Sequence, residues 1–157
     1  MGAVFFYHLT QRPVGETLAM LLHKTQANGW RTLVRGSDPQ RLAALDDQLW
    51  QGSPDSFLAH GLATGEAGDA DQPVLLTTQP GNPNGAKCLM AVDGAGVSAT
   101  EAEDFARVCI LFDGFDPAAV DEARSQWRSL TAAGLAAKYW SEESGRWEMK
   151  AESGGAD

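Results

Sequence analysis

Short apolar runs alternate with stretches of helical periodicity along most of the chain, and this alternation limits the possible folds more than any other feature. A short apolar run bounded by turn residues is typical of a strand, whereas apolar residues three and four apart indicate a helix. Strands are predicted at residues 3–9, 30–34, 73–78, 88–92 and 108–112, and helices at residues 13–27, 38–50, 100–106 and 116–133. This order predicts an α/β fold, with a mostly parallel sheet and helices on both faces.

The C-terminal part of the chain predicts a different unit. Residues 135–140 and 146–150 read as two strands joined around Glu143-Ser144-Gly145, which predicts a C-terminal hairpin. No internal repeat occurs, and no linker is long enough to divide domains. We therefore expect one domain over residues 1–150, followed by a disordered acidic tail at residues 151–157.

Composition narrows the class of partner. The 157 residues carry a formal net charge of −9, which argues against direct binding of nucleic acid, because such proteins usually present a basic face to the phosphates. No apolar run is long enough to span a membrane, and the apolar N-terminal segment lacks the basic region of a signal peptide. Cys88 and Cys109 lie in apolar runs and are expected to be buried free thiols, which favours a cytoplasmic location.

One motif suggests an enzyme. Gly94-Ala95-Gly96-Val97-Ser98-Ala99 has the G-x-G-x-x-A form between a strand and a helix, and Asp113 follows Gly94 by nineteen residues. Such a turn can bring backbone amides close to a pyrophosphate. Here the following helix is short, its first turn is acidic, and the motif lies past the middle of the chain. A nucleotide- or dinucleotide-binding domain remains the alternative to a structural turn.

Other chemical signatures are missing from the sequence. It contains no P-loop, no H-E-x-x-H or G-x-S-x-G motif and no paired C-x-x-C motif. The three histidines are scattered, without acids or cysteines at ligand spacing. We therefore expect no catalytic residue, no metal and no cofactor.

The segment from Ala123 to Ser141 stands out by its charge. It contains Arg124, Arg128 and Lys138 and no acid, in a chain that has 21 acids. Arg124 and Arg128 are one helical turn apart, with Trp127 beside them and Gly134 at the helix end. This set could receive an acidic peptide that ends in an aromatic residue, because arginine pairs bidentately with carboxylates. The alternative is a helix whose cations complement its dipole, with Trp127 packed in the core.

Several blocks of sequence resemble one known family. They are Ala3-Val4-Phe5-Phe6-Tyr7-His8-Leu9, Leu45-Asp46-Asp47-Gln48-Leu49-Trp50 with Ser56-Phe57-Leu58-Ala59-His60, Pro73-Val74-Leu75-Leu76, and the segment from Val108-Cys109-Ile110-Leu111-Phe112 to Arg124-Ser125-Gln126-Trp127-Arg128 and Ala133-Gly134-Leu135. Together they resemble the chi subunit family of DNA polymerase III over about residues 1–150. The resemblance implies a Rossmann-like α/β fold without enzymatic activity.

The resemblance also implies two protein partners. Members of this family bind the acidic, Phe-terminated C-terminal tail of single-stranded-DNA-binding protein, and they bind the psi subunit, which links them to the clamp loader. The tail site carries over to Arg124, Trp127, Arg128 and Gly134. This chain has Leu135 where other members have an aromatic residue, and Val120 at a basic position, which implies a shallower and less basic pocket.

A second partner surface follows from the same resemblance. It matches Trp50 and Phe57, the positions used for psi and for helicase partners. The sequence alone would instead place Trp50 at the core-facing end of the second helix, since tryptophan buries readily.

Overall fold

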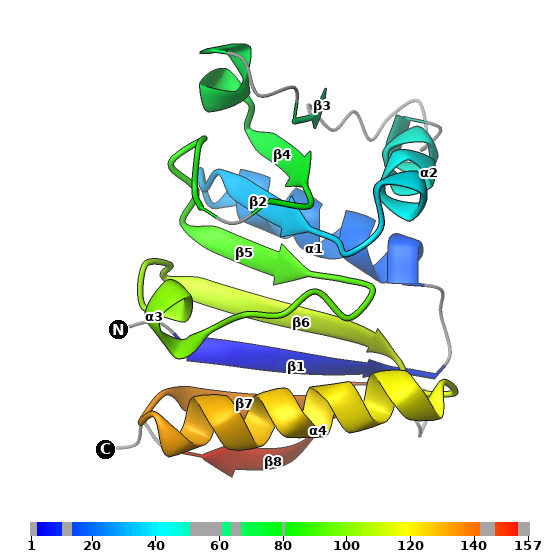
Figure 1. The fold of residues 1–157 in the computed structure, drawn as a ribbon, viewed down its shortest axis with the longest axis vertical. Helices are drawn as coiled ribbons and strands as arrows, with labels where there is room; N and C mark the ends of the chain where they lie inside the picture. Colours follow the sequence, from blue (N-terminus) through cyan, green and yellow to red (C-terminus); the bar gives the residue numbers. More distant parts are fainter. Residues whose placement is uncertain are drawn as a thin grey trace.

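Eight strands form one sheet in the order β3-β4-β2-β5-β6-β1-β7-β8 (Figure 1). The computed structural model describes residues 3–10, 14–50, 61–63, 67–79, 81–141 and 147–153. All neighbouring strands are parallel except β7 and β8. The strands are β1 (Ala3–Leu9), β2 (Thr32–Arg35), β3 (Gly61–Leu62), β4 (Val74–Thr77), β5 (Cys88–Ala91), β6 (Arg107–Asp113), β7 (Ala136–Ser141) and β8 (Glu148–Ser153). The helices are α1 (Val14–Ala27), α2 (Pro39–Trp50), the 3-10 helix η1 (Ala67–Asp71), α3 (Ala99–Ala102) and α4 (Pro117–Ala132). The predicted fold class, mixed α/β with a mostly parallel sheet and a C-terminal hairpin, is confirmed.

Helices cover both faces of the sheet. On one face α1 and α2 bury a cluster around Leu18, Leu22 and Leu45, and on the other α3 and α4 bury a cluster around Phe105 and Leu130. Side chains along a strand point alternately to opposite faces, so strand β1 contributes to both clusters. Val4 and Phe6 lie in the α4 cluster, together with Ala137 of β7, whereas Phe5 and Tyr7 pack against the α1 cluster.

Helix α4, which positions the candidate site, is capped at both ends. The Asp116 side chain accepts a hydrogen bond of 3.0 Å from the Ala118 amide, and Pro117 occupies the first helical position. At the other end Gly134 has a φ of 92°, and the Leu135 amide donates to the Leu130 carbonyl oxygen at 3.2 Å. This is the pattern that ends a helix with a left-handed glycine. The predicted start and end of this helix are confirmed.

Three elements differ from the prediction. Helix α3 ends at Ala102 instead of residue 106, because the chain turns there and the Ala106 amide already donates to the Lys87 carbonyl oxygen at 2.8 Å. Residues 61–72, which fall between the helix predicted at 38–50 and the strand predicted at 73–78, contain the short strand β3 and the helix η1. Strand β8 continues through Ser153, three residues beyond the boundary predicted at residue 150. Residues 154–157 lie outside the described residues.

The two cysteines lie within the sheet. Cys88 and Cys109 are buried free thiols, as predicted. A hydrogen bond with Cys88, together with burial, raises the pKa of the Cys109 thiol well above its ordinary range. That thiol therefore stays protonated at neutral pH, and protonated thiols are poor nucleophiles.

Candidate functional site

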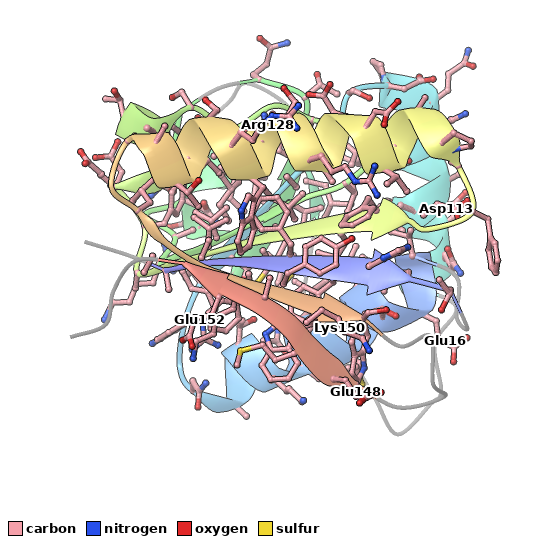
Figure 2. All side chains as sticks on the ribbon, turned by 90° about the horizontal axis from the view of Figure 1, so that it is seen from below. Glu16, Asp113, Arg128, Glu148, Lys150 and Glu152 are labelled. Atoms are coloured by element: carbon pink, nitrogen blue, oxygen red, sulfur yellow. The ribbon has the colours of Figure 1, made fainter. Side chains whose placement is uncertain are left out.

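A cavity of about 580 Å³ lies between α4 and the β7–β8 hairpin. Its lining comes from four elements: β1, α4, β7 and β8. The lining residues are His8, Arg124, Trp127, Arg128, Tyr139, Ser141, Lys150 and Ala151. Figure 2 shows α4 with Arg128 and, below it in that view, β8 with Lys150. Among the described residues, this lining set includes three cationic side chains and no acid.

Helix α4 supplies one wall of the cavity. Arg124 and Arg128 are exposed and stand one helical turn apart, so both guanidinium groups can reach the same ligand. Within the described part of the chain, neither forms an ion pair with an acid. Trp127 is half-buried and makes edge contacts with Phe6 and Tyr139, with ring centres 5.4 and 6.1 Å away. The indole is therefore held in place by the core while part of it stays accessible.

The floor of the cavity combines aromatic and polar groups. The Tyr139 hydroxyl lies 2.9 Å from His8 Nδ1, within hydrogen-bond distance, and His8 stacks on Phe112 with ring centres 5.1 Å apart. Gly114 leaves the room for this imidazole, because a Cβ at that position would collide with the His8 ring. The floor is thus a packed surface that a ligand's apolar group can lie against.

The hairpin supplies the opposite wall. Tyr139 pairs with Ala151 and Trp140 pairs with Met149, so Lys150 falls between two consecutive pairs and has no partner on β7. This register shift is a β-bulge, an extra residue in one of two paired strands. Lys150 Nζ lies 3.9 Å from Glu148 Oε1, and the two side chains are 46% and 40% exposed.

The structure brings some of the predicted site residues together and separates others. Arg124, Trp127 and Arg128 share the cavity. Gly134 is exposed at the end of α4, where it serves as the cap and does not line the cavity. Lys138 lies outside the cavity lining: its Nζ is 5.9 Å from the centre of the Phe5 ring and 3.8 Å from Glu152 Oε2, on the α1 face of the sheet.

The predicted second surface lies at the limit of the description. Trp50 is the last residue of α2, and only its backbone is described. Phe57 lies outside the described residues. The patch formed by Trp50 and Phe57 therefore stays a prediction.

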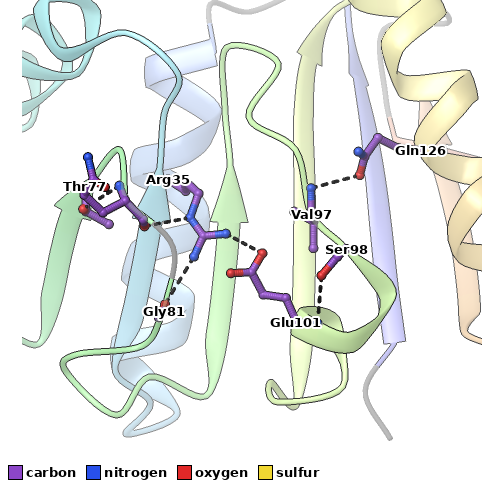
Figure 3. Close-up of polar contacts among 8 residues, drawn as sticks. Arg35, Thr77, Gly81, Val97, Ser98, Glu101 and Gln126 are labelled. Carbon is purple, nitrogen blue, oxygen red and sulfur yellow. Dashed lines mark hydrogen bonds and ion pairs between the residues drawn. The ribbon is translucent and has the colours of Figure 1, made fainter.

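The glycine-rich turn at residues 94–99 forms contacts with other parts of the protein (Figure 3). The Val97 amide donates to Gln126 Oε1 at 3.3 Å, and the Glu101 amide donates to the Ser98 hydroxyl at 3.1 Å. The Glu101 carboxylate pairs with the buried guanidinium of Arg35 at 2.6 Å. Helix α3, which this turn opens, has only four residues and therefore a small dipole.

A second cavity of about 610 Å³ opens beside this turn, at the carboxyl ends of β5 and β6. Nucleotides in α/β sheets bind at this end of the strands. The lining of this second cavity includes four acids and one base, namely Asp93, Asp113, Asp116, Glu122 and Arg41. The Asp113 carboxylate accepts a hydrogen bond of 2.9 Å from the Phe115 amide, so it stabilises its own loop. Phosphate groups would meet mostly like charge in this cavity.

Two features that often carry function do not occur in the described part of the chain. No group of three or more histidine, cysteine, aspartate or glutamate side chains is placed to hold a metal ion there. Within the same residues, no helix is both long and apolar enough to cross a membrane.

Comparison with known proteins decides the family. A family model described as DNA polymerase III chi subunit, HolC, matches residues 1–138. The chain belongs to this chi subunit family. No curated protein matches it. The family gives the chain a role as an accessory subunit of DNA polymerase III in replication. The match to the chi family includes Arg124, Trp127 and Arg128 of α4 but ends at Lys138, so most of the hairpin wall lies beyond it.

Proposed function

We propose that this chi family member is a non-catalytic, cytoplasmic adaptor that binds the acidic, Phe-terminated tail of single-stranded-DNA-binding protein. It would link that protein to the clamp loader, through psi or another component on the clamp-loader side. The observation that carries the proposal is the cavity that gathers Arg124, Arg128 and the accessible part of Trp127 in one place. The proposal needs no direct contact with nucleic acid or membrane.

The chemistry of the cavity matches such a tail. A guanidinium group binds a carboxylate through two parallel hydrogen bonds, and the lining offers two guanidinium groups without an acidic partner among the described residues. A terminal phenyl ring needs apolar contact, which Trp127 and Tyr139 supply at the side and floor. The volume of about 580 Å³ falls within the range of pockets that take a small ligand or a few side chains.

Titration calorimetry with a synthetic peptide of several aspartates ending in phenylalanine tests the proposal. The peptide should bind in a salt-sensitive way, since its contacts are charge pairs at a partly exposed site. Arg128→Ala should weaken binding by about 1–3 kcal/mol, the range for a hydrogen bond to a charged group. Because Arg128 is exposed, the fold should persist.

Arg41→Ala is the matched control, because it removes the same group from α2, on the opposite face of the sheet. It should bind the peptide as the wild-type protein does. A peptide that lacks its terminal phenylalanine should not bind. Unchanged affinity for that shortened peptide, or equal losses in the two arginine variants, would contradict the proposal.

A further inference from the structure

We infer that Lys150, on the hairpin beyond the family match, is a specificity-determining residue that binds a carboxylate of the tail opposite Arg124 and Arg128. The inference rests on the proposed function and deepens it. It gives the cavity two charged walls instead of one, the arginine wall on α4 and a lysine wall on β8.

The β-bulge explains how Lys150 reaches the cavity. In a regular strand, neighbouring side chains point to opposite faces, so Lys150 and Ala151 would not line one cavity. Here both do, because the register shift places Lys150 between the pairs Tyr139–Ala151 and Trp140–Met149. Bulges commonly redirect a side chain in this way.

The charges around Lys150 favour a carboxylate ligand. Lys150 forms an ion pair with Glu148, at 3.9 Å between two half-exposed groups, and such surface pairs contribute little stability. A ligand carboxylate can therefore replace Glu148 at small cost. No acid belongs to the cavity lining in the described part of the chain, and Glu148 is the acid that an incoming carboxylate would displace from Lys150.

The neighbouring lysine of the same hairpin provides a matched comparison. Lys138 and Lys150 have the same side chain and each pairs with a glutamate of β8, but Lys138 lies on the α1 face with Phe5 and outside the cavity lining. Substituting either residue by alanine makes the same change in net charge. A difference between the two variants therefore reports position, not overall charge.

The experiment measures binding of the aspartate-rich, Phe-terminated peptide to full-length wild-type protein and to Lys150→Ala, Lys138→Ala and Lys150→Glu. We expect Lys150→Ala to weaken binding roughly three- to tenfold, Lys150→Glu to weaken it further, and Lys138→Ala to leave it unchanged. Melting temperatures check that each variant is folded.

Two altered peptides identify the carboxylate that Lys150 binds. One peptide carries asparagine in place of each aspartate, and the other ends in an amide. Lys150→Ala should lose its effect on whichever peptide lacks the carboxylate in question. An unchanged affinity of Lys150→Ala, while Arg128→Ala binds weakly, would overturn this inference alone. Equal losses in Lys150→Ala and Lys138→Ala would also overturn it. If the wild-type protein does not bind the peptide, the proposed function fails, and this inference fails with it.

Discussion

Gly94 and Gly96 stand two residues apart in the turn after β5, and their backbones differ. Gly94 has a φ of 74°, in the left-handed region that side chains disfavour. Gly96 does not, and a Cβ there would meet only Gln126 Nε2, at 3.8 Å, an ordinary contact. Backbone geometry therefore requires a glycine at position 94, whereas the contacts described around position 96 would accept a Cβ.

This contrast predicts different costs for the same substitution. Gly94→Ala should lower the free energy of unfolding by about 1 kcal/mol, because alanine is strained at positive φ. Gly96→Ala should change it little. Urea denaturation measures the free energy of unfolding of both variants. A thermal-shift screen with ATP and NAD should show no stabilisation of the wild-type protein or of either variant. A nucleotide affinity that either substitution abolishes would favour the dinucleotide-binding alternative.

The candidate site shows which residues a sequence can indicate. Arg124, Trp127 and Arg128 could be grouped in advance, because one turn of helix brings them together whatever the rest of the chain does. His8 lies on the same face of β1 as Phe6, and strand alternation could have indicated it. Lys150 could not be found in this way, because the bulge reverses the face that simple alternation assigns to it. The prediction grouped Lys138 with the site because it is near in sequence, but in the structure the sheet separates it from the cavity.

At the scale of elements, local sequence signals predict the ends of helices better than they predict the pairing of short strands. Asp116-Pro117 and Gly134 fix α4 through contacts made within a few residues, so its ends were predictable. Strand β3 has two residues and exists only because it pairs with β4, which no local pattern in Gly61–Leu62 reveals. The end of α3 likewise depends on a bond from Ala106 to Lys87.

The two caps of α4 lead to a prediction for this helix. Asp116→Ala should lower the free energy of unfolding by about 1 kcal/mol through loss of the bond to the Ala118 amide. Gly134→Ala should cost a similar amount, because its φ of 92° strains alanine. Chemical denaturation measures both. If Asp116→Asn costs as much as Asp116→Ala, the cap is not the cause, since asparagine also caps helices well.

At the scale of the whole molecule, the cavity and the end of α2 lie apart. The cavity is on the α4 face, whereas Trp50 ends α2, which packs on the opposite face. In Figure 1, α2 and α4 lie near opposite ends of the long axis. An adaptor needs this separation, because two partners must bind at the same time without competing for the same residues.

This separation predicts that the surfaces can be disabled one at a time. Trp50→Ala or Phe57→Ala should spare binding of the tail peptide and impair capture of a clamp-loader component. Arg128→Ala should have the reverse effect. Calorimetry with the peptide and a pull-down from native extract measure the two activities. The assignment is wrong if the Trp50 and Phe57 variants lose the peptide while they keep their other partners.

The position of β1 in the sheet has a consequence for how the chain is made. Its residues Ala3–Leu9 pair with β6 and β7, so Ala3 lies beside Arg107 and Ala136. During synthesis this uncharged, aromatic-rich strand is made before either of its partner strands, so both of its edges stay unpaired until β6 and β7 have followed. Bare edges on such a segment invite association between nascent chains, and distant pairings slow folding. The interval before β6 and β7 are made is therefore the stage at which the new chain exposes this unpaired strand.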